Sequence, residues 1–390
     1  MTTNFKVDNH RRQFPALNDK AYFNYGGQGP LPRQSIDAIT QFYEQIQQLG
    51  PFSQAAYDFV QQQQDLTRSA IAVELGVTPQ TITITEDVTV GCNIALWGIN
   101  WQPGDHLLLS DCEHPGIIAA TQELQRRFQI EVSVCPILET LNQGDPVAVI
   151  ADYLQPNTRL VVISHILWNT GQVLPLQQIM QLCHTAQNQP IRVLVDAAQS
   201  VGVLPLNLVE SDVDFYAFTG HKWLCGPEGI GGLYVSPEAL PELSPTFIGW
   251  RGVTKDKKGH PTGFQPDGQR YEIATSAYPL YAGLWQAIEL HLEWGNAAER
   301  YQRIRDYSQM LWQNLSEIPH IQCLKSTPPE AGLVSFTLKN GMSHAAVVNA
   351  LQKQNIFLRT ILDPDCVRAC VHYLTEIAEI EQLVTALKSL

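Results

Sequence analysis

The sequence predicts an α/β protein with a mainly parallel, seven-stranded sheet in a large domain, followed by a smaller α+β domain. The chain has 390 residues, which is more than one hydrophobic core usually supports. Up to about residue 235, short β-branched runs alternate with helical stretches, which is typical of a parallel sheet covered by helices. Several of these runs are apolar at every position, as strands buried on both faces are.

A helix comes first in the large domain: Ile36, Ile39, Tyr43 and Ile46 share one helical face, and Gly50-Pro51 ends it. The seven strand candidates lie at residues 81–85, 106–110, 131–134, 160–164, 192–195, 215–218 and 233–235.

The second half of the chain breaks this rhythm. Residues 236–270 are rich in Pro, Gly and charge and predict a long loop, and residues 280–317 predict a long helical region. Further strand candidates follow at 334–338, 357–359 and 367–373. We expect a large domain over residues 18–278 and a small domain formed by residues 1–17 and 279–390.

Composition and charge exclude several classes of protein. The formal net charge of -13 at pH 7 disfavours binding to nucleic acid or to anionic membranes. No apolar segment follows the charged start MTTNFKVDNHRRQF, so we expect no export signal and a cytoplasmic, reducing location. The eight cysteines are scattered and form no Cys-x-x-Cys pair, which predicts neither a metal site nor a disulfide framework.

Ligands of parallel sheets bind at the carboxyl ends of the strands, and two ionisable residues occupy such positions. Lys222 follows the strand candidate at 215–218 and precedes a Gly-rich turn, where an apolar environment would let its amine lose a proton and attack an aldehyde. Asp196 ends another apolar strand, and a protonated pyridine nitrogen is one partner for such a carboxylate. A surface cation and a helix N-cap are the alternative interpretations.

Two further signals follow other strands. His114, after the strand at 106–110, could stack on an aromatic ring and move protons, although such a residue is more often an ordinary loop residue. Thr89 stands at the start of a predicted helix, where free N–H groups and a hydroxyl form a phosphate site. Ordinary helix capping is the alternative for Thr89. Each signal is weak by itself, but the occurrence of all four in this order along the chain is a strong signal.

In these residues and their order, the chain resembles the class V group of fold-type I pyridoxal-phosphate (PLP) enzymes. This group includes cysteine desulfurases, selenocysteine lyases and cystine C–S lyases. The resemblance covers nearly the whole chain and is strongest to the cystine C–S lyases. It rests on Asp196-Ala-Ala-Gln199, Thr219-Gly-His-Lys222, Gly226-Pro-x-Gly-x-Gly, Cys112-Glu-His114 and Arg270-Tyr-Glu-Ile-Ala-Thr275.

The resemblance implies a role for each matching residue toward the cofactor. Lys222 would bind PLP covalently, Asp196 would pair with the ring nitrogen, His114 would stack on the ring, and Gln199 would contact the phenolic oxygen. The phosphate would be held by Thr89, the backbone at Val88, Thr219 and His221. Thr275 would reach the phosphate of a neighbouring subunit, which implies a homodimer with shared active sites.

The resemblance places the substrate beside two arginines, Arg359 and Arg368, and the second is favoured for a bidentate contact with the carboxylate. Gly27, Asn169 and Arg251 are further candidate substrate-binding residues. Arg251 belongs to the segment Phe247-Ile-Gly-Trp-Arg-Gly, which differs from its counterpart in the desulfurases and could put a cation at the pocket mouth.

Two departures from the desulfurase pattern decide the functional expectation. The interval between Arg359 and Arg368 is too short for the mobile loop that carries the sulfur-accepting cysteine, and Cys366 is too close to Arg368 to replace it. Leu-Trp168 also stands where desulfurases show Ser-Asn, so the usual asparagine contact to the cofactor oxygen is altered, and Asn169 is the candidate to replace it.

We therefore predict β-elimination from cystine or cysteine, giving pyruvate, ammonia and a persulfide or sulfide. Lys222 would take the α-proton, and cystine would release a persulfide, a better leaving group than the thiol of cysteine. A desulfurase, an aminotransferase or an epimerase on the same scaffold is the alternative within enzymes, and a non-catalytic PLP-binding protein is the alternative outside them. An acceptor protein for sulfur or for iron–sulfur cluster assembly is a further expected partner.

Overall fold

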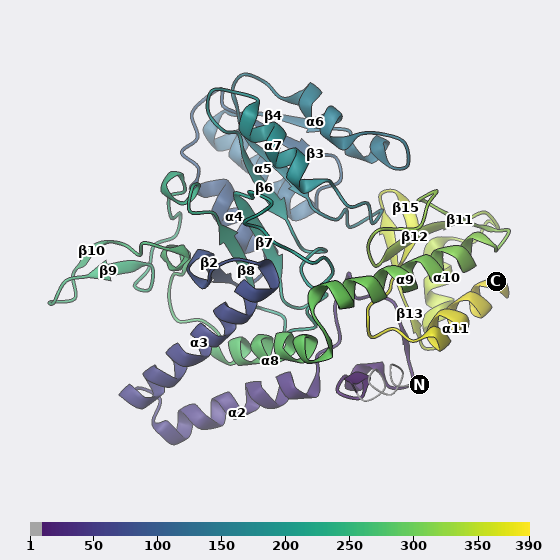
Figure 1. Cartoon of the computed structure of the whole chain (residues 1–390), viewed down its shortest axis with the longest axis horizontal. Coiled ribbons are helices and arrows are strands. Elements are labelled where there is room, and N and C mark those ends of the chain that lie inside the picture. Colours follow the sequence, from purple (N-terminus) through teal and green to yellow (C-terminus); the bar gives the residue numbers. More distant parts are fainter. Residues whose placement is uncertain (1–9) are drawn as a thin grey trace.

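The computed structural model describes residues 10–390, so the expectation for residues 1–9 lies outside the described residues. A seven-stranded sheet forms the centre of the large domain (Figure 1). In spatial order its strands are β2 (Ile82–Thr85), β8 (Gly231–Val235), β7 (Phe215–Thr219), β6 (Arg192–Asp196), β5 (Thr158–Ser164), β3 (His106–Ser110) and β4 (Glu131–Cys135).

The prediction of a mainly parallel seven-stranded sheet is confirmed. The pairs β3–β4, β3–β5, β5–β6 and β6–β7 are parallel, and only β8 runs antiparallel to its neighbours β7 and β2. Alternate residues of the central strands enter separate cores on the two faces of the sheet: Val161 and Ile163 pack on one side, and Leu160 and Val162 on the other. Burial on both faces is the reason that these strands are apolar throughout.

Helices cover both faces of this sheet. On one face lie α4 (Val88–Gly98) and α5 (Pro115–Phe128), and on the other lie α3 (Gln54–Leu75), α6 (Pro146–Tyr153), α7 (Leu176–Thr185) and α8 (Tyr278–Trp294). Helix α2 (Arg33–Leu49) packs on the outside of α8, where Ser35 donates a hydrogen bond to the Gly283 carbonyl (2.7 Å). Tyr43 is exposed, so the buried side of α2 is centred on Ser35 and Phe42 instead.

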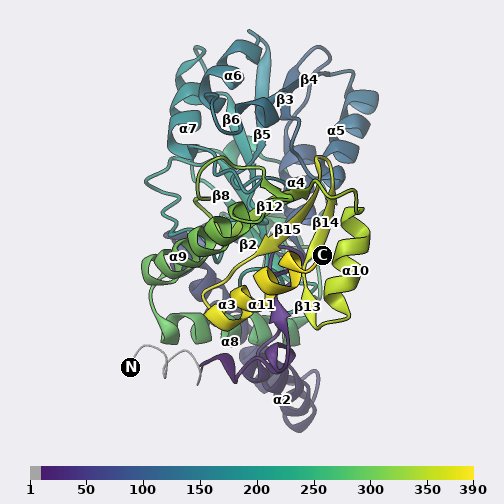
Figure 2. The ribbon, with the colours of Figure 1, turned by 90° about the vertical axis from the view of Figure 1, so that its right-hand side faces the viewer.

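The small domain has a four-stranded antiparallel sheet with helices against it (Figure 2). Its strands, in spatial order, are β11 (Ile321–Cys323), β12 (Leu333–Leu338), β15 (Asp365–Cys370) and β14 (Arg359–Leu362). Its helices are α9 (Ala297–Ser316), α10 (His344–Gln352) and α11 (Ile377–Lys388). Near the chain start, β1 (Ala21–Tyr22) pairs in parallel with β13 (Ile356–Phe357), so this segment packs with the small domain.

The domain boundaries stay a prediction, and two contacts bear on them. Helix α8 follows the expected boundary at residue 278, yet its Leu284 and Ile288 belong to a core of the large sheet. A separate cluster that includes Phe14, Trp223 and Leu333 joins the N-terminal segment, the large domain and the small domain. This cluster fixes the loop that follows Lys222 against the small domain.

Residues 236–270 contain more structure than the predicted long loop. Strands β9 (Val253–Lys255) and β10 (Pro261–Phe264) pair as an antiparallel hairpin that projects from the large domain (Figure 1). Short 3₁₀ turns complete the chain at η1 (Pro15–Leu17), η2 (Pro79–Thr81), η3 (Ile137–Thr140), η4 (Leu240–Glu242) and η5 (Gly268–Tyr271). Among residues 10–390, no helix combines the length and the apolar character needed to cross a membrane.

Candidate active site

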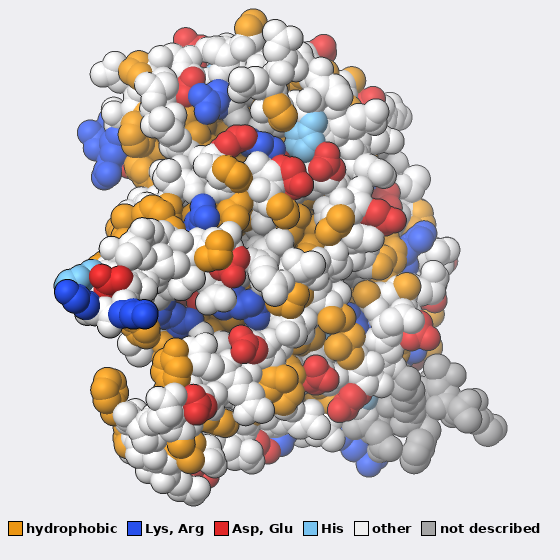
Figure 3. All heavy atoms as spheres, turned by 60° about the vertical axis from the view of Figure 1, so that its left-hand side comes forward, with side chains coloured by type: hydrophobic (Ala, Val, Ile, Leu, Met, Phe, Trp, Pro, Cys, Tyr) orange, Lys and Arg blue, Asp and Glu red, His pale blue; other side chains and the backbone are white. Residues whose placement is uncertain are grey.

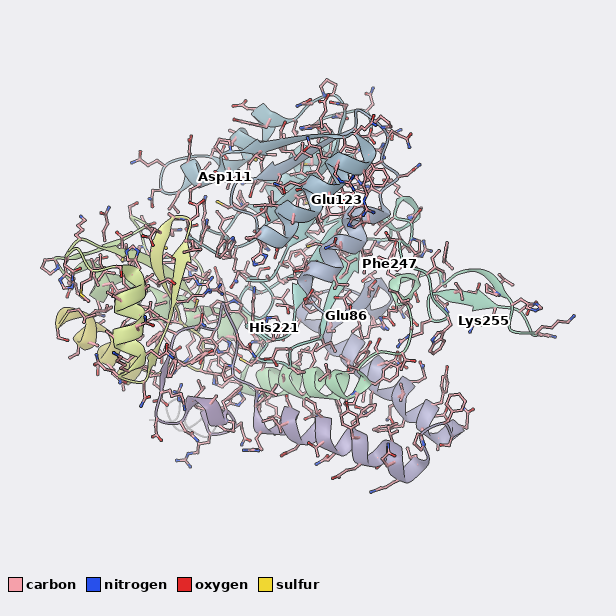
Figure 4. All side chains as sticks on the ribbon, turned by 180° about the vertical axis from the view of Figure 1, so that it is seen from behind. Glu86, Asp111, Glu123, His221, Phe247 and Lys255 are labelled. Carbon is pink, nitrogen blue, oxygen red and sulfur yellow. The ribbon has the colours of Figure 1, made fainter. Side chains whose placement is uncertain are left out.

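A cavity of about 200 Å³ opens at the carboxyl ends of the parallel strands. It collects side chains that are far apart in the sequence, and Figure 4 shows His221, one of them, near the middle of the molecule. The residues that line the cavity are Asp87, Val88, Thr89, His114, Ser164, Ile166, Trp168, Asp196, Ala198, Gln199, His221, Lys222 and Arg359. This is the position expected for a ligand site in a doubly wound sheet.

Lys222 reaches the cavity from the turn after β7. The pKa of its ammonium group is lowered from 10.5 to about 8: burial is the main cause, Asp196 opposes it, and the positive charges of Arg368 and Arg359 add to it. The tight turn is possible because Gly220 and Gly226 pack closely, with the Gly226 N–H donating to the Gly220 carbonyl (2.9 Å). A lysine with this pKa supplies a neutral amine near neutral pH, as attack on an aldehyde requires.

Asp196 ends β6 and is buried beside Lys222. One carboxylate oxygen accepts a hydrogen bond from the Ala198 N–H (2.9 Å). Burial raises the pKa of Asp196, and the charge of Lys222 lowers it. A buried carboxylate of this kind needs a cationic partner, and a protonated ring nitrogen in the cavity would be one.

A second buried acid, Glu113, lies behind Asp196. Its carboxylate accepts hydrogen bonds from the Ser110 hydroxyl (2.6 Å), the Ser164 hydroxyl (2.8 Å) and the Ser164 N–H (2.8 Å). Burial, followed by the charge of Asp196, raises the pKa of Glu113 to about 8. Ser164 is the register partner of Asp196 in the β5–β6 pair, so Glu113 fixes the strand beside Asp196.

His114 caps the start of α5, where its Nδ1 accepts a hydrogen bond from the Gly116 N–H (3.2 Å). Burial lowers the pKa of His114, which favours the neutral form of its imidazole. A neutral ring at the cavity wall is suited to stacking on a flat ligand.

The start of α4 forms one end of the cavity. Asp87 caps the helix by accepting from the Val90 N–H (2.9 Å), and Val88 and Thr89 occupy its first turn. His221 lies nearby, with its Nδ1 2.6 Å from the Thr219 hydroxyl. Backbone N–H groups of a first helical turn, together with a hydroxyl and an imidazole, form a site for phosphate.

Gln199 lines the cavity, but other residues already hold its amide. Its Nε2 donates to the Gly26 carbonyl (2.9 Å), and its Oε1 accepts from the Trp223 indole (2.8 Å). One N–H of the amide remains for a phenolic oxygen. Gly27, the neighbour of Gly26, lies outside the cavity wall and close to the Asn24 side chain.

The two arginines lie side by side, since Arg359 of β14 and Arg368 of β15 are register partners. Arg359 lines the cavity. Arg368 is buried, and its Nη1 donates to the Trp168 carbonyl (2.6 Å). Its Nε and Nη2 are buried and have no hydrogen-bond partner among residues 10–390. Two orphaned guanidinium N–H groups fit a carboxylate, because the planar fork matches its two oxygens.

Asn169 and Arg251 have partners elsewhere. The Asn169 side chain donates to the Asp363 carbonyl (3.2 Å) in the β14–β15 turn and lies outside the cavity wall. Arg251 is half-buried and pairs with Glu272 (2.6 Å), which also pairs with Arg68 (2.8 Å). Thr275 is exposed on the segment before α8. Within the described part of one chain, neither Arg251 nor Thr275 lines the cavity.

Several residues of the site were absent from the sequence-based candidates. Ser164 ends β5, and the rule that identified Asp196 would also have identified it. Trp168 was noted only as a departure from the desulfurase pattern, yet it forms part of the wall. No local signal marks Glu113 as a buried partner of Ser164, because the two residues come from different strand ends.

The residues of the cavity fit PLP. The buried amine of Lys222 suits its aldehyde, the buried carboxylate of Asp196 suits a protonated ring nitrogen, and the first turn of α4 suits its phosphate. His114 offers a neutral ring beside these groups. All four features occupy one cavity.

Comparisons with known proteins agree with this geometry. The family described as aminotransferase class-V matches residues 21–384. A structure of a C-DES mutant with glycine covalently linked to the PLP cofactor is 53% identical, with a TM-score of 0.95, over 97% of this chain and 98% of the other. A complex between the cystine C–S lyase C-DES and its reaction product cysteine persulfide is also 53% identical, with a TM-score of 0.94, over 96% and 99%.

Curated relatives are more distant. Isopenicillin N epimerase of Streptomyces clavuligerus is 27% identical over 94% of each chain. Cysteine desulfurase of Escherichia coli O127:H6 is 29% identical, covering 91% of this chain and 88% of its own length.

Proposed function

The chain belongs to the class-V aminotransferase family, and we propose that it is a PLP-dependent C–S lyase. It catalyses β-elimination from cystine or cysteine and releases pyruvate, ammonia and a persulfide or sulfide. The full-length similarity to the cystine C–S lyase C-DES supports this assignment. The cofactor is PLP, which fits the residues of the cavity.

One structural observation favours elimination over a desulfurase reaction. Strands β14 and β15 are joined directly by the turn at Asp363-Pro364, so this hairpin has no loop that could carry a sulfur-accepting cysteine. Cys366 is fully buried on β15, and burial raises the pKa of its thiol to about 12. No thiol is among the residues that line the cavity. Elimination requires no nucleophile from the protein, because the sulfur leaves with the product.

We propose a role for each of these residues. PLP held by these residues would supply an aldehyde that reacts with the substrate amine and a ring that accepts electrons. Lys222 takes the α-proton on Nζ, since its lowered pKa makes it a base near neutral pH. The buried carboxylate of Asp196 would keep the ring nitrogen of the cofactor protonated. Arg368 holds the substrate carboxylate with Nε and Nη2, and Arg359 adds a second positive charge.

We further propose that the protein is a homodimer with shared active sites. The exposed segment around the β9–β10 hairpin carries Phe247, Ile248, Trp250 and Ile273, a group of apolar side chains larger than an isolated surface would favour. Figure 4 shows Phe247 and Lys255 on this projecting part, and Figure 3 shows basic and apolar side chains together on this face. Thr275 belongs to the same region, and the resemblance implies that it would reach the phosphate of the neighbouring subunit.

We also propose that the protein is cytoplasmic and that its product passes sulfur to an acceptor protein. Eight unpaired cysteines suit a reducing, cytoplasmic compartment. A persulfide product would require a downstream acceptor of sulfane sulfur, such as a protein of iron–sulfur cluster assembly.

The carbon product tests the proposal. The purified holoenzyme is incubated with cystine, cysteine and selenocysteine in parallel, and pyruvate and alanine are both measured. We expect pyruvate from cystine. The Cys366→Ser variant should form pyruvate at a rate reduced by less than about twofold, because no protein thiol takes part. Alanine as the main product would instead indicate a desulfurase, and a racemised substrate without pyruvate would indicate an epimerase. Either result would overturn the lyase assignment.

A further inference from the structure

Trp168 contributes a buried hydrogen-bond donor that has no acceptor. Its side chain lines the cavity with Lys222, His114 and Arg359, and its ring lies 6.0 Å from that of His114 in an edge-on arrangement. The indole Nε1 is shielded from solvent and has no partner among residues 10–390. Most other tryptophans of the chain do have one: for example, the indole N–H of Trp223 donates to Gln199 and that of Trp312 to the Lys325 carbonyl. A buried donor without a partner destabilises the protein, so such donors are usually satisfied by a ligand, water or ion.

The backbone of Trp168 joins this donor to the arginine end of the cavity. Its carbonyl accepts the Nη1 hydrogen bond of Arg368 (2.6 Å), and Arg368 itself keeps two orphaned N–H groups. Asn169 is held on both sides: its side chain donates to the Asp363 carbonyl, and its own carbonyl accepts from the Ser335 hydroxyl (2.6 Å). The position of the Trp168 backbone is therefore fixed by contacts that do not depend on the indole ring.

We infer that Trp168 recognises the substrate, with its indole N–H donating a hydrogen bond to the carboxylate of the bound amino acid alongside Arg368. This role rests on the proposed function of the site and adds a residue to it. The indole Nε1 and the Arg368 Nε and Nη2 are three unsatisfied donors on two residues that are hydrogen-bonded to each other. A carboxylate has enough lone pairs to accept all three. The positive charges of Arg359 and Arg368 make the region favourable for an anion.

Amino-acid binding tests this role without requiring turnover. Glycine carries the amine and the carboxylate, whereas methylamine carries the amine alone, and each is titrated into the holoenzyme while the cofactor absorption is followed. In Trp168→Phe, which keeps an aromatic ring and removes the N–H, we expect glycine to bind about 10- to 100-fold more weakly, the effect of losing a hydrogen bond to a charged group. Methylamine affinity should change less than about twofold.

Two further variants serve as controls. Trp312→Phe removes an indole N–H on α9 in the small domain, outside the cavity wall, and should leave glycine affinity unchanged. Trp168→His restores a ring N–H and should recover part of the lost glycine affinity.

Three results would overturn the role of Trp168. An equal loss of glycine and methylamine affinity would mean that the ring acts on the cofactor or on the amine. A shift in the pH midpoint of the cofactor absorption without a selective loss of glycine would assign the N–H to the cofactor oxygen. Loss of the bound cofactor in Trp168→Phe would do the same, since a donor for the substrate carboxylate is not needed for cofactor retention. Failure of the lyase assignment appears separately, as glycine binding without pyruvate formation from cystine.

Discussion

The lowered pKa of Lys222 makes a quantitative prediction about cofactor capture. A pKa of about 8 leaves roughly one lysine in ten neutral at pH 7. A lysine with the ordinary value of 10.5 would be neutral in about one molecule in three thousand at that pH. The environment of the cavity therefore raises the concentration of reactive amine by a factor of about 300 at neutral pH.

The assay is the rate at which apoenzyme binds added PLP covalently, followed through the absorption of the bound cofactor between pH 6 and 10. We expect the rate constant to reach half of its maximum near pH 8. In Asp196→Asn the midpoint should move to lower pH, because the carboxylate is the main group that stabilises the lysine cation. Lys222→Ala should bind the cofactor without the covalent bond and should have no turnover.

Two outcomes would contradict this reasoning. A midpoint near pH 10 would show that the amine is solvated like that of a surface lysine. An unchanged midpoint in Asp196→Asn would show that the two side chains do not face each other. Either result would also remove the basis for Lys222 as the proton acceptor.

The remaining predictions concern buried charges outside the cavity. Glu272→Gln should lower the free energy of unfolding by about 3–5 kcal/mol in urea denaturation, because the buried Arg68 and the half-buried Arg251 both lose their carboxylate partner. Glu123→Gln, on the exposed face of α5 (Figure 4), should change it by less than about 0.5 kcal/mol. The hydrogen bond from His184 to Asp214 (3.0 Å) raises the pKa of His184 above 6.5. The stabilisation that this pair supplies is complete below about pH 6.5 and is lost as the pH rises through the raised value. His184→Asn should therefore reduce the difference in unfolding free energy between pH 6 and pH 8, and an unaltered difference would contradict the assignment.

The sequence determined the sheet and the centre of the active site. Strands that are buried on both faces are apolar along their whole length, so their positions could be predicted within a few residues. Because ligands bind at the carboxyl ends of parallel strands, Lys222, Asp196 and His114 could be identified as members of one site. The burial that lowers the pKa of Lys222 follows from the same position.

Tertiary structure alone decided which polar groups remain available for a ligand. Gln199 lines the cavity, but Gly26 and Trp223, which lie elsewhere in the sequence, already bond to its amide, so only one N–H of that amide remains for a ligand. Trp168 had no predicted role, yet its buried indole N–H has no acceptor among residues 10–390. Hydrogen-bond partners of buried side chains come from distant segments that meet only when the chain closes, and no local pattern records that meeting.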